Sequence, residues 1–431
     1  MKRNALLVVA LAAAVAFTVL VHNANDQRGG GGTAQPGGPQ FTLPGQPQSG
    51  QPGAAGQGGP GSGQAGGQPA TGTASGHQTG TRTTGTPGGG APGGGQVDPD
   101  SFFTPTKLRP GEKPPQFVIV SFDGVGSHEK WEYWKGVADQ AHMRFTGFLS
   151  GVYLLSAEHK HLYHGPGHNP GASSIGFAAD AASVRQEILD LNDAWRRGYE
   201  IGTHYNGHFC SGSGYAGASW NTANWNSELG QFFNFYRYYR AANADPSLPT
   251  LQVPLTSIKG GRTPCLEGRP SQLMPALRHY NFSYDTSGNR NGIAWPSKNQ
   301  WGIWEFPMAY IPLAGRNSGV ISMDYNFWVK QTGNPPSTGD SVANSNQIVA
   351  TYQQMYQAAY TGNRAPLVLG NHFNSWNNNA YTQALATFVT TTCRRPNTYC
   401  VTYRDVIRWM QLQDPGVLAH LQQLPAVDTV A

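Results

Sequence analysis

Apolar residues are distributed unevenly along this chain of 431 residues. Residues 5 to 21 form an unbroken apolar run without charges, whereas residues 27 to 113 are mainly Gly, Pro, Gln, Ser and Thr. A segment of the second kind cannot bury enough apolar surface to offset the entropy lost on ordering. From residue 114 onward apolar residues return in regular patterns. The chain is therefore expected to divide into residues 1–26, 27–113 and 114–431, the last being one large folded domain.

The first 26 residues predict either a signal peptide or an N-terminal membrane anchor. A positively charged start precedes the apolar run, which is longer than most signal-peptide cores and just short of a comfortable membrane span. His22 is not small and makes a poor cleavage site, which slightly favours an uncleaved anchor. In both cases the protein is expected to be extracellular, secreted or anchored to the cell membrane facing outward. Residues 27–113 are expected to form a disordered linker.

Strand and helix patterns alternate in the domain. Buried strands are typified by Gln116 to Phe122, whose apolar and β-branched residues lack alternation. Helices are typified by residues 181 to 197, where Val184, Ile188 and Leu191 recur at helical spacing. Further strands are expected at 145–155, 199–203, 257–261, 282–285, 319–324, 366–371 and 399–403, and further helices at 221–243, 271–280, 347–360, 381–392 and from 404. This alternation predicts a parallel α/β sheet, either open or closed into a barrel.

Composition narrows the partners and the compartment. The formal net charge of +5 is too small to indicate nucleic acid, and no basic stripe with interleaved aromatic residues occurs. The 11 Trp, 19 Tyr and 18 Phe suit an extracellular domain that faces carbohydrate. Cys393 and Cys400 flank a turn sequence and are expected to pair, which leaves Cys210 to pair with Cys265. No C-x-x-C spacing supports the alternative of a structural zinc site.

Polar residues follow five of the predicted strands. Asp123, Arg262, Asp285 and His372 each stand at or just after a strand end, and His204 and His208 follow the strand at 199–203. The carboxyl ends of parallel strands are where α/β proteins assemble their sites. Two imidazoles four residues apart can meet one cation, and neutral imidazole suits zinc and similar metals. Each residue also has a structural reading, such as a helix cap or a surface ion pair, but five in one chain favour a site.

This ordered set resembles the polysaccharide deacetylases of carbohydrate esterase family 4, whose motifs run roughly T-F-D-D-G, H-[S/T]-x-x-H, R-x-P-Y, a strand-borne Asp/Trp motif and L-x-H. Residues 121–124, S-F-D-G, look like the first motif. Residues 197–208, R-G-Y-E-I-G-T-H-Y-N-G-H, look like the second and are the most specific match. Residues 262–265, R-T-P-C, look like the third. Asp285 falls where the fourth is expected, and His372 where the fifth is.

The resemblance implies a distorted (β/α) barrel and a metal-dependent hydrolase that removes N-acetyl groups from a cell-wall or extracellular polysaccharide. It implies that Asp123 is the general base and that His204 and His208 hold a divalent metal ion, zinc above all. Arg262 would orient Asp123. His372 would protonate the departing amine, held in place by Asp285.

The sequence departs from the family pattern where the metal should bind. The family's metal-binding Asp corresponds to Gly124, which has no side chain. Either Asp123 itself turns to the metal, or a residue such as Asp324 or His128 substitutes, or metal binding is lost. Tyr205 also replaces the Ser/Thr of the second motif, and Gly370 the Leu of the last.

Three functions therefore stay open. They are a metal-dependent polysaccharide deacetylase, an impaired deacetylase-like domain that binds carbohydrate, and another amide or ester hydrolase on the same scaffold. A histidine cluster at 159, 161, 164 and 168 is read as a surface loop, with a second metal site as the alternative. The expected partners are an N-acetylated polysaccharide and, if the N-terminal segment is uncleaved, a membrane. The N-x-S patterns at Asn281 and Asn374 fit glycosylation.

Overall fold

The computed structural model describes residues 102–429. The expected signal peptide or anchor and the linker up to residue 101 lie outside them. Residues 102–113 already pack on the domain, because Phe103 is buried and its ring contacts those of Phe117 and Tyr399. The packed region thus begins earlier than the expected boundary at residue 114. Within the described part of the chain, none of the helices is long and apolar enough to cross a membrane.

A nine-stranded sheet forms the centre of the domain, in the order β11-β1-β2-β3-β4-β5-β8-β7, with β12 also paired to β1. Its strands are β1 (Gln116–Asp123), β2 (Thr146–Leu149), β3 (Glu200–Thr203), β4 (Gly260–Gly261), β5 (Tyr284–Asp285), β7 (Ser297–Lys298), β8 (Trp304–Glu305), β11 (Leu367–His372) and β12 (Thr398–Cys400). The pairs are parallel except β7 with β8. All eight residues of β1 are buried, as expected for a strand covered on both faces. The predicted α/β class with a parallel sheet is confirmed.

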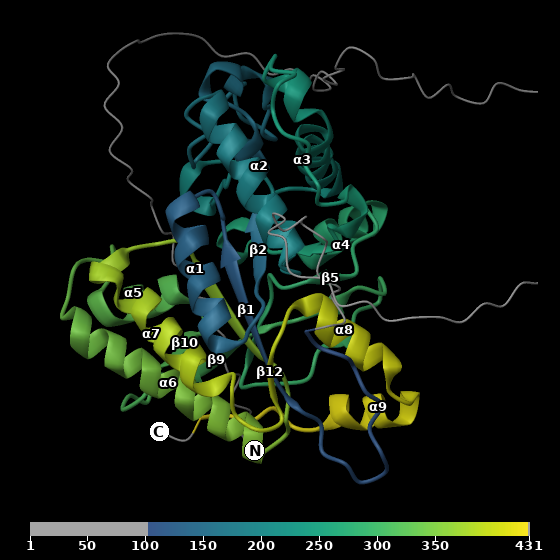
Figure 1. Ribbon diagram of the computed structural model, residues 1–431, viewed down its shortest axis with the longest axis vertical. Coiled ribbons are helices and arrows are strands. Elements are labelled where there is room, and N and C mark those ends of the chain that lie inside the picture. Colours follow the sequence, from purple (N-terminus) through teal and green to yellow (C-terminus); the bar gives the residue numbers. More distant parts are fainter. Residues whose placement is uncertain (1–101, 430–431) are drawn as a thin grey trace, which may run out of the picture. The chain divides into compact units, whose positions relative to one another are not determined.

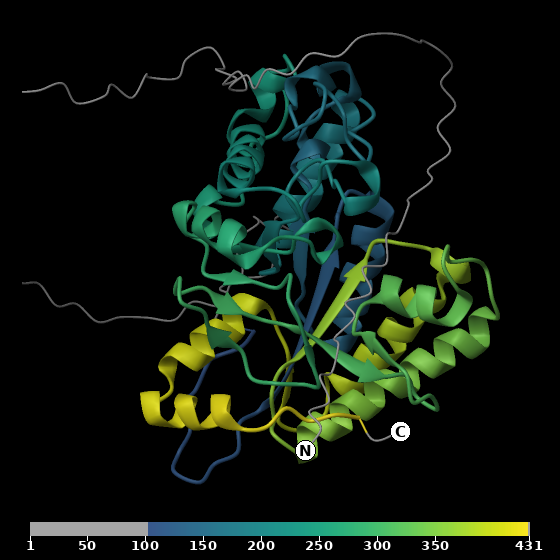
Figure 2. The same cartoon turned by 180° about the vertical axis from the view of Figure 1, so that it is seen from behind.

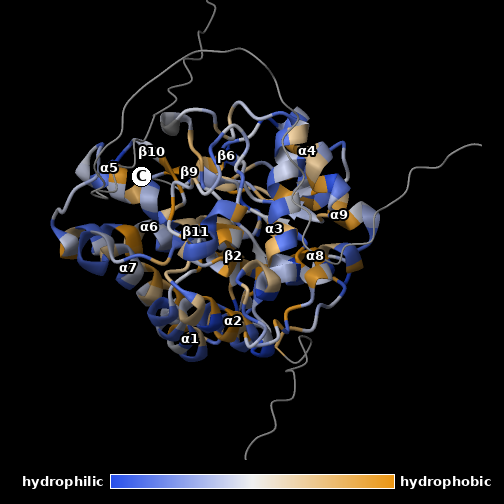
Figure 3. Cartoon of the chain, turned by 90° about the horizontal axis from the view of Figure 1, so that it is seen from above, coloured by the Kyte–Doolittle hydropathy of each residue, from blue (hydrophilic) through white to orange (hydrophobic). Residues whose placement is uncertain are grey.

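Helices surround these strands (Figures 1 and 3). They are α1 (His128–Ala141), α2 (Ala181–Arg196), α3 (Thr222–Ala242), α4 (Pro270–His279), α5 (Asp324–Thr332), α6 (Ser341–Thr361), α7 (Trp376–Thr392), α8 (Tyr403–Leu412) and α9 (Pro415–Gln423). A three-stranded sheet of β10 (Gly319–Ile321), β9 (Met308–Pro312) and β6 (Asn289–Asn291) lies beside the main one. In Figure 2 the yellow-green strand β11 runs next to the blue strand β1, with which it pairs in parallel.

The main sheet is curled rather than flat. Strands β1 and β4 are three places apart, which in a flat sheet would separate them by about 14 Å. Nevertheless, the guanidinium of Arg262, which follows β4, lies 2.9 Å from the carboxylate of Asp123 at the end of β1. The curl brings distant strand ends together, so the expected distorted barrel is present as an incomplete one whose sheet does not close on itself.

Several expected elements differ in extent. The expected strand at 145–155 is only β2, followed by a short 3-10 helix, Gly151–Leu154. Helix α1 was not predicted, because charged residues interrupt its apolar face. In the structure Ser127 caps this helix, and Trp131 and Trp134 are buried. The expected strand at 319–324 ends at Ile321, since Asp324 begins α5.

Candidate active site

The predicted site residues follow neighbouring strands at one edge of the curled sheet. Asp123 ends β1, His204 follows β3, Arg262 follows β4 and His372 ends β11. Because these strands run parallel, their carboxyl ends meet at the same edge, where such folds place ligands. Asp123, His204 and Arg262 are buried, whereas the side chain of His372 is 24% exposed.

Arg262 fixes Asp123. Its guanidinium is fully buried and donates from Nη1 to Asp123 Oδ1 at 2.9 Å. Its other nitrogens are also engaged, as Nη2 donates to Ser121 Oγ and Tyr403 Oη at 3.0 Å, and Nε to the Thr286 carbonyl at 3.1 Å. Breaking a buried pair of this kind costs about 3–5 kcal/mol because it leaves an uncompensated charge. Arg262 therefore holds the Asp123 carboxylate in one orientation.

His204 and His208 lie side by side, with ring centroids 5.1 Å apart. The Nδ1 of His204 donates to the carbonyl of Arg262 at 2.8 Å, which leaves the lone pair on Nε2. That Nε2 is buried without a hydrogen-bond partner. Asp123 is the Cα partner of His372 across β1 and β11, and its charge also acts on His208, so these groups lie at the same edge of the sheet.

Both imidazoles are neutral. Burial, with a smaller contribution from the charge of His372, lowers the pKa of His204 to about 3. Burial and the charge of His204 lower the pKa of His208 to about 3. A neutral imidazole with a free, buried nitrogen, oriented by a carbonyl on its other nitrogen, is the arrangement that metal-binding histidines adopt. The pair therefore fits a divalent cation.

A third protein ligand is not gathered with them. The groups of three His, Cys, Asp or Glu ligand atoms found between residues 102 and 429 are His208 with Cys210 and Cys265, and His128 with Glu132 and Asp190. The first group contains disulfide sulfurs, which do not ligate as thiolates. Of the two substitutes considered from the sequence, His128 pairs with Asp190 on α2, and Asp324 pairs with His372.

The space in front of Gly124 is bordered by hydroxyl groups. Gly124 has φ +63°, and a Cβ built there would lie 3.5 Å from Tyr153 Oη and 3.9 Å from Ser150 Oγ. Burial raises the pKa of Tyr153 to about 12, so its phenol stays protonated at neutral pH. A neutral phenol is a hydrogen-bond donor and a poor replacement for a metal-binding carboxylate.

His372 is held by Asp324, and this corrects the expectation that Asp285 holds it. The Nδ1 of His372 donates to Asp324 Oδ1 at 2.7 Å, and its backbone N–H donates to Asp324 Oδ2 at 2.7 Å. Asp285 instead accepts hydrogen bonds from the N–H and the hydroxyl of Ser287. Asp285 also lines a cavity of about 340 Å³ that includes Trp295 and Glu305. Its role in catalysis stays a prediction.

From the sequence, Asp324 was considered only as a possible metal ligand. Its function as the partner of His372 was missed because the two residues are 48 positions apart, at a helix start and a strand end. Tyr403, which bonds Arg262, was likewise read as the end of a strand although it begins α8. Packing explains why Gly370 stands where the family's last motif has Leu. A Cβ at this position would lie 2.7 Å from Met308 Sδ and 3.2 Å from Arg262 Nη1.

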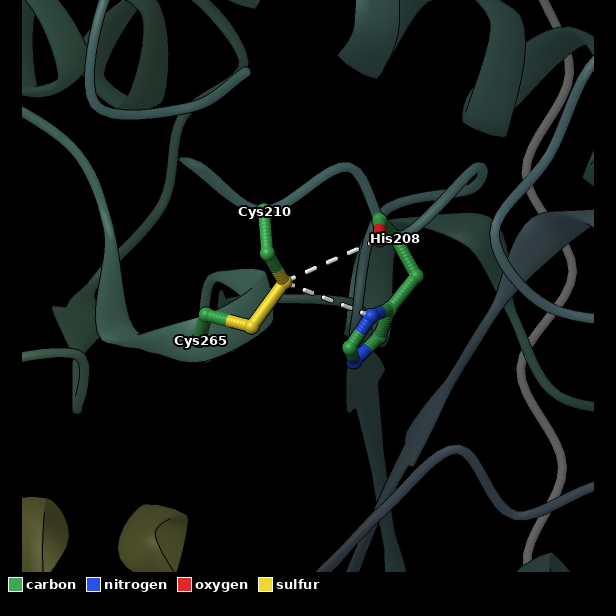
Figure 4. A group of neighbouring side chains, drawn as sticks. All are labelled: His208, Cys210 and Cys265. Atoms are coloured by element: carbon green, nitrogen blue, oxygen red, sulfur yellow. Dashed lines mark hydrogen bonds between the residues drawn. A yellow bond between two sulfur atoms is a disulfide. The ribbon is translucent and has the colours of Figure 1, made fainter. Parts of the chain in front are cut away.

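Both predicted disulfides are confirmed. Cys210–Cys265 joins the loop that carries His208 to the loop that follows Arg262 (Figure 4). The sulfur of Cys210 lies 3.6 Å from Nδ1 of His208. His208 and Cys265 both have φ +54°, a left-handed conformation that is unfavourable for residues with side chains. The disulfide ties these two loops together beside the imidazole pair.

The other sequence patterns are explained by local contacts. In the histidine loop, His159 bonds Ser156 and His168 stacks on Phe209, and the described residues hold no three-ligand group there. Asn374 is buried and donates to Asp324 Oδ2 at 2.7 Å, so its side chain is engaged in the site rather than presented for glycosylation. Asn281 is exposed.

No family model matches the chain, and no curated protein matches its sequence. Among solved structures, a Mycobacterium smegmatis protein described as a polysaccharide deacetylase is 13% identical with a TM-score of 0.43, over 76% of this chain and 98% of that one. The family 4 carbohydrate esterase of Streptomyces lividans is 13% identical with a TM-score of 0.33, over 66% and 91%. A family 4 acetyl xylan esterase of Clostridium thermocellum, solved with a cobalt ion, is 13% identical with a TM-score of 0.36, over 70% and 96%.

Sequence identities and TM-scores this low assign neither an activity nor a substrate to the chain. Any assignment must rest on the site residues. The solved structures that this chain resembles are polysaccharide deacetylases and family 4 carbohydrate esterases, the family whose motifs its sequence also resembles.

Proposed function

We propose that the protein is an exported, metal-dependent hydrolase that removes N-acetyl groups from a cell-wall or extracellular polysaccharide. The observation that carries this proposal is the convergence of a buried carboxylate paired with Arg262, two neutral imidazoles and a carboxylate-bound histidine at one sheet edge. Amide hydrolysis needs a base for the attacking water and an acid for the leaving amine. Asp123 and His372, at the ends of the neighbouring strands β1 and β11, would supply these two groups.

Asp123 is the proposed base. Arg262 holds Asp123 by a buried ion pair. The charge of Asp123 acts on both His208 and His372. A carboxylate fixed in this way can accept a proton from water without first reorienting. Arg262 touches no substrate in this scheme and is a positioning residue.

His372 is the proposed acid. Burial by itself lowers the pKa of His372, but the charge of Asp324 and the hydrogen bond to it outweigh burial, and the pKa is raised overall. The group is therefore protonated over a wider pH range than a free histidine. Protonation of the amine nitrogen as the C–N bond breaks gives acetate and a free amino group on the sugar.

His204 and His208 are the residues that would hold a divalent cation, with zinc as the proposed metal. When bound, such an ion polarises the acetyl carbonyl and lowers the pKa of a bound water. The proposed export agrees with the two disulfides, which persist in oxidising compartments.

A second candidate function is supported by Gly124. Without a carboxylate at this position, the domain would bind carbohydrate through the same site with slow or absent turnover. The experiment that separates the two measures zinc and cobalt content of the purified full chain and acetate release from N-acetylated chito-oligosaccharides, peptidoglycan, and simple amide and ester substrates. Stoichiometric metal with acetate from a polysaccharide supports the deacetylase. Acetate only from the simple substrates indicates another hydrolase, and oligosaccharide binding without acetate indicates the binding domain.

Asp324→Asn is expected to move the basic limb of the pH profile to lower pH. An acid must be protonated to act, so activity falls as pH rises through the pKa of His372. The substitution removes the charge that raises this pKa, and activity is lost at a lower pH. The measurement is kcat/KM against pH. Asp285→Asn serves as the control, because Asp285 bonds Ser287 instead. A shifted limb in Asp285→Asn and an unshifted one in Asp324→Asn would return the role to Asp285.

A further inference from the structure

Three aromatic side chains form a partly exposed cluster beside His372. They are Tyr325 and Trp328 on α5 and Trp376 at the start of α7, and none of them is fully buried. The rings of Trp328 and Trp376 are stacked, with centroids 5.1 Å apart and planes at 18°. The ring of Tyr325 meets both edge-on, at 5.4 Å from Trp376 and 6.2 Å from Trp328. Large aromatic residues grouped at a protein surface are typical of ligand sites.

This aromatic cluster is continuous with the proposed acid. The ring of Trp376 lies 5.1 Å from that of His372. The backbone N–H of Trp376 donates to Asn374 Oδ1, whose Nδ2 donates to Asp324 Oδ2. Tyr325 directly follows Asp324 in the chain and donates its N–H to Asp324 Oδ1 at 2.7 Å. The residues that orient the acid therefore also orient the cluster.

Backbone strain supports a functional role for Trp376. The next three residues, Asn377, Asn378 and Asn379, all have left-handed φ of 46°, 53° and 63°. Non-glycine residues rarely adopt this conformation even singly, and such strain persists where the surroundings impose it, often at functional sites. Here Asn377 Oδ1 accepts from the Gly339 N–H at 2.8 Å. These three residues form the first turn of α7, directly after Trp376.

Polar groups border the cluster. Lys130 Nζ donates to Ser375 Oγ at 2.7 Å and lies 3.4 Å from Asn379 Oδ1. Sugars present an apolar face of C–H groups and a rim of hydroxyl groups. Flat aromatic side chains bind the face, while lysine, serine and asparagine bind the rim.

We infer that Tyr325, Trp328 and Trp376 form a subsite for one pyranose ring of the polysaccharide. This ring would be the neighbour of the sugar unit that carries the acetamido group. This inference rests on the proposed function for the identity of the ligand. It predicts that oligosaccharides bind more tightly than single sugars, because only a longer ligand reaches both His372 and the aromatic cluster.

The test measures binding of N-acetylchitohexaose, acetylated xylohexaose and N-acetylglucosamine to the full chain by calorimetry and tryptophan fluorescence. Trp376→Ala and Trp328→Ala are expected to weaken whichever hexasaccharide binds by about tenfold and to leave the monosaccharide unchanged. The matched control is Trp301→Ala, a partly exposed tryptophan in the turn between β7 and β8, at the opposite end of the sheet from β11. Circular dichroism checks that each variant is folded.

A second pair of variants tests the strained turn without touching the aromatic rings. Asn378 is exposed, and glycine tolerates its φ of 53° whereas alanine does not. Asn378→Gly is expected to retain hexasaccharide binding, and Asn378→Ala to weaken it and to change the Trp376 emission.

Equal hexasaccharide affinity in Trp376→Ala and wild type, or no oligosaccharide binding to the wild type, would overturn the subsite. Acetate release is measured in parallel on every variant. Loss of binding in Trp376→Ala in a protein that never releases acetate would keep the subsite and reject the deacetylase.

Discussion

His204→Ala is expected to abolish binding of a divalent cation, and with it acetate release. The variant removes the buried Nε2 that lacks a hydrogen-bond partner and leaves His208 as the single imidazole of the pair. Replacing even an outer-shell partner of a metal ligand costs about 10- to 100-fold in affinity, and loss of a ligand costs more. Cobalt titration followed by visible absorption measures the change directly, independently of any activity.

His159→Ala is the matched control for this variant. Like His204, His159 has a hydrogen-bonded Nδ1, which lies 3.0 Å from Ser156 Oγ. Unlike His204, it belongs to the histidine loop. It should bind cobalt as the wild type does. If His204→Ala retained the metal and His159→Ala lost it, the cation site would belong to the histidine loop.

The strands and helices of the centre were predictable because their patterns are strong. Residues 116–122 contain apolar side chains on both faces of the strand, a pattern typical of a strand covered on both faces. The short outer strands β7 and β8 were not predictable, because each contains two residues and depends on its neighbours for pairing. Their conformation is a consequence of tertiary contacts rather than of local propensity.

The candidate site was predictable where a single residue at a strand end supplies the chemistry. Asp123, His204 and Arg262 come directly at the ends of strands, and the parallel order brings them to one edge. The pairing of His372 with Asp324 was not predictable, because it depends on the packing of α5 against β11, two elements that are far apart in the sequence. The aromatic cluster was missed for the same reason, since Trp328 and Trp376 are far apart in the sequence and stack only in the fold.

Gly124→Asp is expected to tighten cation binding by roughly 10- to 100-fold, the range that a change in the ligand environment produces. Catalytic zinc sites normally have three protein ligands, and this chain gathers two imidazoles. The backbone leaves room for the new side chain, because its Cβ would meet nothing closer than Tyr153 Oη at 3.5 Å. The φ of +63° makes the substitution strained, at about 1–2 kcal/mol of stability without metal. With metal, tighter binding to the folded state should offset this loss.

Gly124→Asn is the control that isolates the charge, because asparagine has the shape of aspartate and is strained to a similar degree by the left-handed backbone. It should show the same loss of stability without any gain in affinity. Tyr153→Phe added to Gly124→Asp tests a second point. The Tyr153 hydroxyl would otherwise donate to the new carboxylate and hold it away from the cation, so the double variant should bind at least as tightly as Gly124→Asp. Calorimetry with zinc and thermal unfolding with and without zinc give both quantities. If the wild type already binds one zinc tightly and Gly124→Asp weakens it, an additional ligand completes the site, and Asp123 loses its role as the base.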